Sequence, residues 1–91
     1  MLQGGQLRAA RALLRWTHKE LSDRASVTEP VSVDALRKWE ATDGPIRGIT
    51  AKVNAVVLVL EAAGVEFIPA GSYLGTGGPG VRLRAEPADK A

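Results

Sequence analysis

The side chains best suited to recognising a partner are concentrated in residues 32–38. Arg37 and Lys38 carry hydrogen-bond donors, and Asp34 carries acceptors three and four residues earlier. On a helix this spacing places all three side chains on one face, where they can meet a polar partner together. Two plainer interpretations stand beside this one: the face is simply solvated, or Asp34 stabilises the start of a helix through the helix dipole.

Side chains that support catalysis or hold metals are scarce. The chain has no cysteine and one histidine, which excludes thiolate metal sites, a cysteine nucleophile and a multi-histidine site. The glycine-rich residues 75–80 lack the Gly-Lys-Ser/Thr ending of a phosphate-binding loop, and no helix is expected after them. We therefore expect a protein that is not an enzyme, with no cofactor and no metal.

The composition is that of an ordinary folded domain. The chain has 91 residues, 45% hydrophobic and 24% charged, which predicts one domain over residues 1–91. The longest unbroken apolar run covers residues 55–60, far short of the roughly 18 residues of a membrane span. With no secretory signal at the start either, we expect a cytoplasmic protein with no membrane partner. Residues 1–24 hold five basic and two acidic side chains, which fits an anionic partner or a solvated basic face.

Hydrophobic spacing predicts two helices before Pro30. The first covers residues 6–16, where Leu7, Ala10 and Leu14 recur at helical intervals. The second follows at once, because Thr17-His18-Lys19-Glu20 forms a capping box. It must end before Pro30, since proline disfavours a helical conformation at the residue ahead of it.

A third helix is expected next, with two alternative starts. Either Pro30 is its first residue or Ser32 caps it, so that it begins between Pro30 and Val33. It runs to about residue 41 with Leu36 and Trp39 facing inward, and Asp43-Gly44-Pro45 ends it.

The second half of the chain predicts a longer helix and a hairpin. Thr50 can cap a fourth helix that runs through residue 63, with Gly64 as its left-handed terminator. Valine and leucine cover most of the circumference of this helix, which is more apolar surface than one small core can bury. Residues 65–68 and 81–84 favour the two strands of a long-looped antiparallel hairpin over residues 65–84, and residues 85–91 a frayed tail.

The order of these segments is similar to that of a known family. The motifs are QLRAARALLRWT at residues 6–17, ELSDRA at 20–25, VS at 31–32, LRKWE at 36–40, LEAAGVEFI at 60–68 and GPGVRLR at 78–84. Together they resemble the XRE family of lambda-repressor-like DNA-binding domains, in a subgroup of small bacterial regulators. The resemblance covers roughly residues 6–84. It implies a mainly α fold with a four-helix lambda-repressor-like helix-turn-helix core over residues 6–64, followed by a short C-terminal antiparallel β-hairpin.

The chain departs from the family pattern around the start of the third helix. Counting back from Glu40 favours Ser32 as the start, which leaves four extra residues and no glycine in the preceding turn. The start itself, Ser32-Val33-Asp34, is also unusual for the family, which more often has glutamine, arginine or serine there.

The resemblance also implies a function. It predicts a sequence-specific transcriptional regulator that binds double-stranded DNA as a homodimer on an inverted-repeat operator. The alternative is a protein-binding module on the same fold, an antitoxin or antiactivator with weak or no DNA readout, which the longer turn favours.

If the chain binds DNA, the third helix enters a major groove and the residues of its first two turns reach base edges. The second helix start and the segment around the fourth helix start would hold phosphates. The expected base contacts are Ser32, Val33, Asp34, Arg37 and Lys38, and the expected phosphate contacts are Thr17, His18, Lys19, Arg47, Thr50 and Lys52.

Two further groups of residues complete the expectations. In the family an arginine of the first helix pairs with a glutamate that ends the recognition helix, and Arg11 and Glu40 match these positions, so the resemblance implies a structural ion pair. The surplus apolar surface of the fourth helix and the following strand predicts a dimer interface. The residues expected there are Val56, Val59, Leu60 and Phe67.

Overall fold

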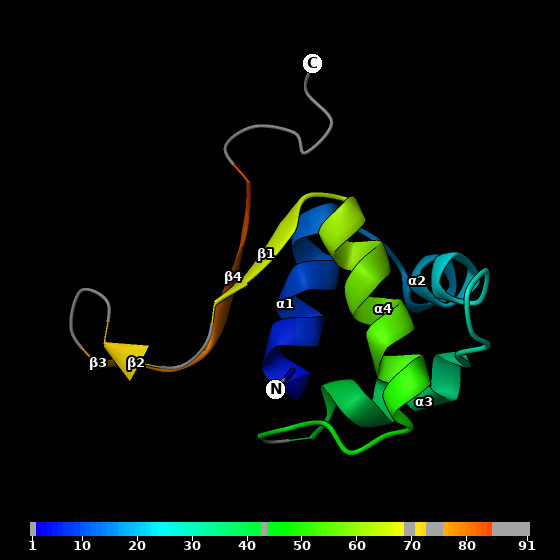
Figure 1. Cartoon of the computed structure of the whole chain (residues 1–91), viewed down its shortest axis with the longest axis horizontal. Helices are drawn as coiled ribbons and strands as arrows, with labels where there is room; N and C mark the ends of the chain where they lie inside the picture. The colour runs from blue at the N-terminus through cyan, green and yellow to red at the C-terminus, as the bar shows by residue number, and fades with distance from the viewer. Residues whose placement is uncertain (1, 43, 69–70, 73–75, 85–91) are drawn as a thin grey trace.

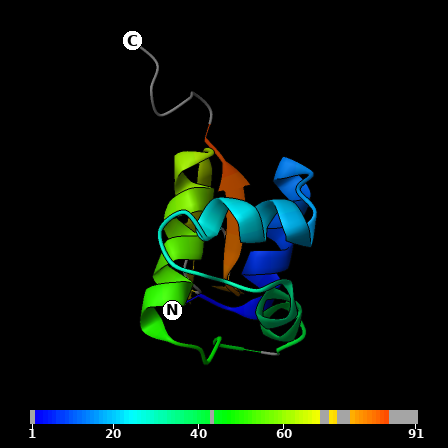
Figure 2. The same cartoon turned by 90° about the vertical axis from the view of Figure 1, so that its right-hand side faces the viewer.

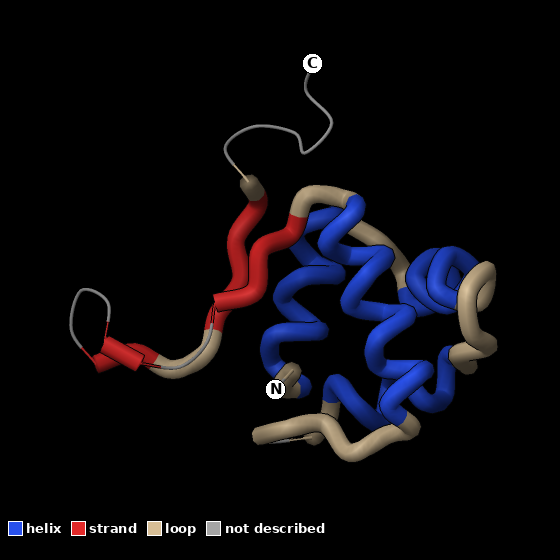
Figure 3. Tube along the Cα trace, viewed as in Figure 1, coloured by secondary structure: helices blue, strands red, loops and turns tan. Residues whose placement is uncertain are grey.

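A computed structural model describes residues 2–42, 44–68, 71–72 and 76–84 of the chain. Its helices are α1 (Gly4–Leu14), α2 (His18–Ala25), α3 (Val33–Glu40) and α4 (Thr50–Ala62). Its strands are β1 (Val65–Ile68), β2 (Gly71–Ser72), β3 (Thr76–Gly77) and β4 (Gly80–Leu83). The described chain is therefore mainly helical with a small antiparallel sheet, as predicted (Figures 1 and 3).

Helix α1 begins two residues earlier than the sequence predicted. The Gln6 side-chain oxygen accepts a hydrogen bond from the Gln3 amide at 2.9 Å, which satisfies a free N–H at the helix start. Gly4 lies against the end of α3, where a β-carbon would come within 2.3 Å of the backbone oxygens of Trp39 and Thr42. Gly4 therefore permits close packing of α1 on α3.

The starts of α2 and α3 follow local side-chain chemistry. Thr17 Oγ1 accepts from the Glu20 amide at 3.0 Å and Glu20 Oε1 accepts from the Thr17 amide at 3.0 Å, so the predicted capping box is confirmed. Ser32 Oγ accepts from the Ala35 amide at 3.0 Å. This bond decides between the two predicted starts of the third helix: Ser32 is the N-cap, and Pro30 lies in the turn.

Helix α4 differs from its prediction at the first residue. Ile49 occupies the N-cap position and no side chain caps the helix, so the expectation that Thr50 is the cap is wrong. Thr50 is instead the first helical residue, because the chain turns into the helix one residue earlier. At the other end Gly64 has the predicted left-handed conformation, with φ of 106°.

The hydrophobic core lies between the four helices and the first strand. Fully buried leucines and valines come from each of these elements, and their burial supplies the main stabilisation of so small a fold. The largest of them are Leu7, Leu21, Leu36, Val56, Leu60 and Val65.

The predicted hairpin is confirmed as the antiparallel pair β1–β4, with Val65 opposite Leu83 and Ile68 opposite Gly80. A second short pair, β2–β3, lies beyond it where the sequence predicted only a loop. The Gln6 side-chain amide donates to the backbone oxygens of Ile68 at 3.2 Å and Gly80 at 3.0 Å, which joins α1 to the hairpin. The predicted tail at residues 85–91 lies outside the described residues.

The hairpin and the α2–α3 pair lie at opposite sides of the molecule. In Figure 1 the β2–β3 end points away from the helices on the left, while α2 and α3 lie on the right. Figure 2 looks directly onto α2 and α3, with α4 beside them and β4 behind. The β2–β3 end of the hairpin therefore lies far from the surface that α2 and α3 form.

Candidate nucleic-acid interface

Helix α3 has one buried side and one open side. Leu36, Trp39 and Glu40 are buried, with exposed fractions of 0%, 7% and 6%. On the open side Arg37 and Lys38 are exposed, and neither side chain forms a hydrogen bond or ion pair with any residue that the structure describes. The structure therefore brings the predicted base-contacting residues together: Ser32, Asp34, Arg37 and Lys38 are exposed, and Val33 is half-buried.

Two serines hold the long turn between α2 and α3. Ser22 lies within α2, and Ser26 is the C-cap of α2. Ser22 Oγ donates to the backbone oxygen of Val31. Ser26 Oγ accepts from the Val31 amide at 3.1 Å and also lies 3.3 Å from the Val31 oxygen. Because Val31 is itself buried, with 2% of its surface exposed, the extra turn residues are anchored at one point just before α3. Sequence reasoning missed both serines, although a serine on the inner side of an amphipathic helix is a usable signal of such a contact.

The start of α2 offers fewer free groups than predicted. The Thr17 hydroxyl is occupied by the capping bond, although its side chain is exposed. His18 Nε2 lies 3.2 Å from Glu40 Oε1, so this ring nitrogen faces another side chain and not a phosphate position. Lys19 Nζ pairs with Asp23 at 3.0 Å, and both side chains are largely exposed. Such an exposed pair contributes little and can exchange for an outside anion.

The second predicted group of phosphate contacts lies around the start of α4. It contains two exposed side chains and one that already has a hydrogen-bond partner. Arg47 and Thr50 are exposed. Lys52 is occupied, because its Nζ donates to the backbone oxygen of Pro30 and links α4 to the α2–α3 turn. Lys52 therefore supports the position of the turn, a role that the sequence did not predict.

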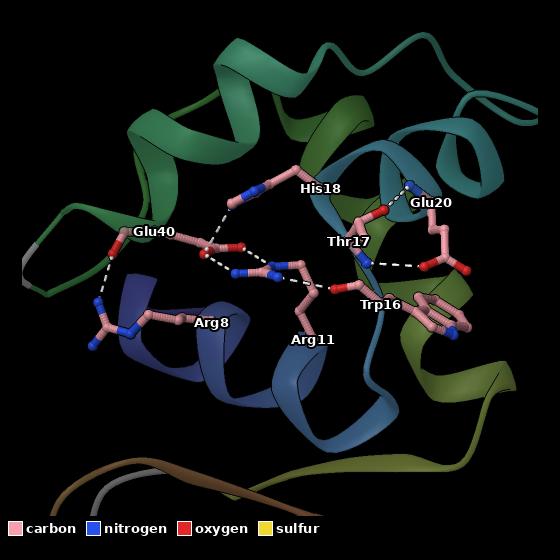
Figure 4. Close-up of polar contacts among 7 residues, drawn as sticks. All are labelled: Arg8, Arg11, Trp16, Thr17, His18, Glu20 and Glu40. Atoms are coloured by element: carbon pink, nitrogen blue, oxygen red, sulfur yellow. Dashed lines mark hydrogen bonds and ion pairs between the residues drawn. The ribbon is translucent and has the colours of Figure 1, made fainter.

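The ion pair expected between Arg11 and Glu40 is present and has two hydrogen bonds (Figure 4). Arg11 Nε lies 2.8 Å from Glu40 Oε2, and Nη2 lies 3.0 Å from Oε1. Arg11 Nη1 also donates to the Trp16 backbone oxygen at 2.9 Å, at the α1–α2 junction. One guanidinium thus connects α1, the junction and α3.

Glu40 is a buried carboxylate with two basic neighbours, Arg11 and His18. Burial acts to raise the pKa of Glu40, but the hydrogen bonds and charge of Arg11, with a smaller contribution from His18, hold the pKa below its ordinary value. The hydrogen bond to Glu40 in turn raises the pKa of Arg11. The carboxylate is therefore charged at neutral pH and holds α3 in place from its buried side.

Two residues of the predicted dimer interface lie in the core. Val56 and Leu60 are fully buried, so their assignment to an interface is wrong. They form the inner side of α4, and a helix that is apolar all round gives no sequence signal of which side faces the core. Val59 and Phe67 are partly buried and pack against the same core.

Comparison of the chain with protein families, curated proteins and solved structures finds no match. Within the described residues there is no group of three or more histidine, aspartate or glutamate side chains that can hold a metal ion. No helix in the same part of the chain is long and apolar enough to cross a membrane.

Proposed function

We propose that this protein is a sequence-specific DNA-binding transcriptional regulator of the lambda-repressor-like helix-turn-helix class. It acts as a homodimer on an inverted repeat, and α3 is its recognition helix. The observation that carries the proposal is the contrast between the two sides of α3. Its inner side is held by the core and by Arg11, while its outer side presents the Arg37 and Lys38 side chains without partners among the described residues.

The outer side of α3 has the chemistry that base readout requires. A major groove admits one helix, and an arginine in that groove can donate two hydrogen bonds to guanine O6 and N7. Lys38 is a second donor to guanine, and Asp34 can accept from the amino group of cytosine. Val33 is half-buried and can only pack against a thymine methyl group at the edge of the contact.

The phosphate contacts come from the exposed side chains on either side of α3. Lys19 and Arg47 supply charge, and Thr50 supplies a hydroxyl group close to a helix start. Thr17 Oγ1 accepts the capping bond, and its hydroxyl hydrogen can still be donated to a phosphate oxygen. His18 and Lys52 support this surface from within the protein and are left out of the phosphate contacts, because their polar atoms already contact Glu40 and Pro30. Of the six residues predicted to contact phosphates, the proposal therefore keeps four.

A gel-shift assay on the DNA upstream of the protein's own gene, repeated over a range of salt concentrations, tests the proposal. We expect binding that weakens as salt increases, and we expect Arg37→Ala to abolish the preference for that DNA at a cost of about 1–3 kcal/mol. Arg82→Ala in β4 is the matched control, since it removes the same charge on the hairpin. Unchanged affinity and site selection in Arg37→Ala would remove α3 as the recognition helix.

A protein-binding module, such as an antitoxin or antiactivator, is the second candidate function. The balance of charge near α3 favours it, because Lys19 is neutralised by Asp23 and the start of α3 carries an exposed Asp34. In that case the chain shows no salt-dependent retention on any DNA, and Arg37→Ala weakens binding to the partner protein.

A further inference from the structure

The outer side of α4 is an apolar surface that no other described element covers. Ala51, Asn54, Leu58 and Ala62 recur at intervals of three and four residues, and all four are exposed. Leu58 alone leaves 59% of its surface in solvent. We call these four residues the α4 outer face. One exposed leucine on its own is ordinary, so this face indicates a protein-binding surface only because apolar surface continues around it.

Apolar surface continues on both sides of the α4 outer face. A hollow of about 190 Å³ lies on one side, with Leu2, Ile46 and Val57 in its lining. A shallower hollow of about 420 Å³ lies on the other side, where the Arg24 guanidinium stacks 4.4 Å from the centre of the Trp16 ring. Val27, which is 87% exposed, lines this second hollow, so the apolar surface extends from α4 to the end of α2.

The distribution of charge on α4 favours a second copy of the same chain as the partner. The only charged residues among the thirteen of α4 are Lys52 and Glu61. Lys52 is turned towards Pro30, and Glu61 is half-buried near the helix end. A two-fold interface places each central residue near its own copy, so a central charge would meet a like charge. The α4 outer face has none, whereas binding of a different protein commonly uses opposite charges.

Asn54 provides a contact that is complementary to itself. Its amide both donates and accepts, so two copies of Asn54 can hydrogen-bond to each other across a two-fold axis. A single asparagine in an apolar helix seam selects the register and the number of chains. Asn54 is exposed, and its side-chain amide has no hydrogen-bond partner in the part of the chain that the structure describes.

We propose that two copies of this chain associate through the α4 outer face, with Leu58 at the centre and Asn54 paired with its own copy. This inference specifies the interface of the homodimer in the proposed function, but it does not depend on DNA binding. In Figure 2 α4 lies on the left of the view and α3 on the lower right.

Sedimentation of the full chain over the micromolar concentration range, without DNA, tests the proposed interface. We expect a dimer for the wild type, and we expect Leu58→Arg to weaken the dimer by roughly 30-fold or more, as loss of a central contact does. Leu13→Arg is the matched control, because Leu13 is 42% exposed on α1 and should leave the dimer intact. A monomeric wild type, or a Leu58→Arg variant that remains dimeric, would overturn the inference.

Cysteine cross-linking gives a second test, because the chain has no cysteine of its own. We expect Asn54→Cys to form a covalent dimer under mild oxidation, and we expect Ala9→Cys, at an exposed position of α1, to stay monomeric. Cross-linking of Ala9→Cys alone would move the interface to α1 and contradict the inference. A cross-linked dimer that binds no DNA would instead overturn the proposed function and leave the interface intact.

Discussion

Arg11 and Glu40 lie 29 residues apart in the chain, yet their side chains form two hydrogen bonds of 2.8 and 3.0 Å. The carboxylate is close to the C-terminus of α3, where the helix dipole alone would disfavour a negative charge. Arg11 and His18 compensate for it, and Arg8 donates to the Glu40 backbone oxygen at 3.3 Å. The end of α3 is thus surrounded by basic side chains from α1 and α2.

Removal of the Glu40 carboxylate should destabilise the fold. Glu40→Ala leaves the Arg11 guanidinium without its partner in a partly buried position, and we expect the free energy of unfolding to fall by about 3 kcal/mol. Thermal and denaturant unfolding measure this change. The control is Glu66→Ala, which breaks an exposed pair with Arg82 and should cost less than about 1 kcal/mol. A Glu40→Ala variant that unfolds like the wild type would contradict the structural role of the pair.

The same carboxylate predicts a pH dependence of stability. Because the pKa of Glu40 is lowered on folding, its stabilising effect is complete above its ordinary value of 4.5 and is lost as the pH falls through the lower folded value. We expect the difference in unfolding free energy between the wild type and Glu40→Gln to be greatest near neutral pH and to shrink in acid. Urea titrations at a series of pH values measure it. A difference that stays constant into strong acid would show that the charge of Glu40 does not matter.

The neighbouring glycines at the start of α1 should respond in opposite directions to alanine. A β-carbon at Gly4 meets two backbone oxygens at 2.3 Å, so Gly4→Ala forces α1 away from α3 at a cost of about 1–3 kcal/mol. A β-carbon at Gly5 meets nothing within 4 Å, and alanine favours a helix there by about 0.5–1 kcal/mol. Melting temperatures of the two variants give the comparison. Equal shifts would mean that α1 does not pack closely on α3.

The serines that anchor the turn should control how firmly α3 is held. We expect Ser22→Ala combined with Ser26→Ala to cost about 1–3 kcal/mol, because the Val31 amide and oxygen lose their side-chain partners. Under the proposed function, DNA affinity should fall while the preferred DNA sequence stays the same, since none of the proposed base-contacting residues has changed. Gel shifts with the double variant and with Thr28→Ala, an exposed change in the same turn, test this. A change of preferred sequence would place the serines in the interface itself.

Local patterns in the sequence predicted the starts of α2 and α3 well. The Thr17 and Ser32 caps depend on residues only three positions away, and such short-range chemistry is visible in a sequence. Contacts between distant segments were not visible in the same way. The Gln6 bonds to Ile68 and Gly80 join positions more than 60 residues apart, and no local pattern specifies them.

The candidate site was predicted less evenly than the fold. The exposed face of α3 follows directly from the inward positions of Leu36 and Trp39, so Arg37 and Lys38 could be placed from the sequence. His18 and Lys52 could not, because their partners, Glu40 and Pro30, come from other parts of the chain. For α4 the sequence showed that apolar surface is in excess but did not show which side is in excess, and Val56 and Leu60 were therefore misassigned.

The Gln6 contact also constrains the order in which the protein can be made and folded. Its bond to Gly80 spans 74 residues, so a nascent chain on the ribosome lacks this contact until β4 has emerged. Until then the Gln6 amide lacks one of its two backbone partners, and the part of α1 that contacts β4 stays in water. Long-range contacts of this kind slow folding, because the chain must close a large loop before it gains their stabilisation. Folding of this domain is therefore completed after synthesis of the hairpin, and the partly made helical segment is the form most exposed to proteases and chaperones.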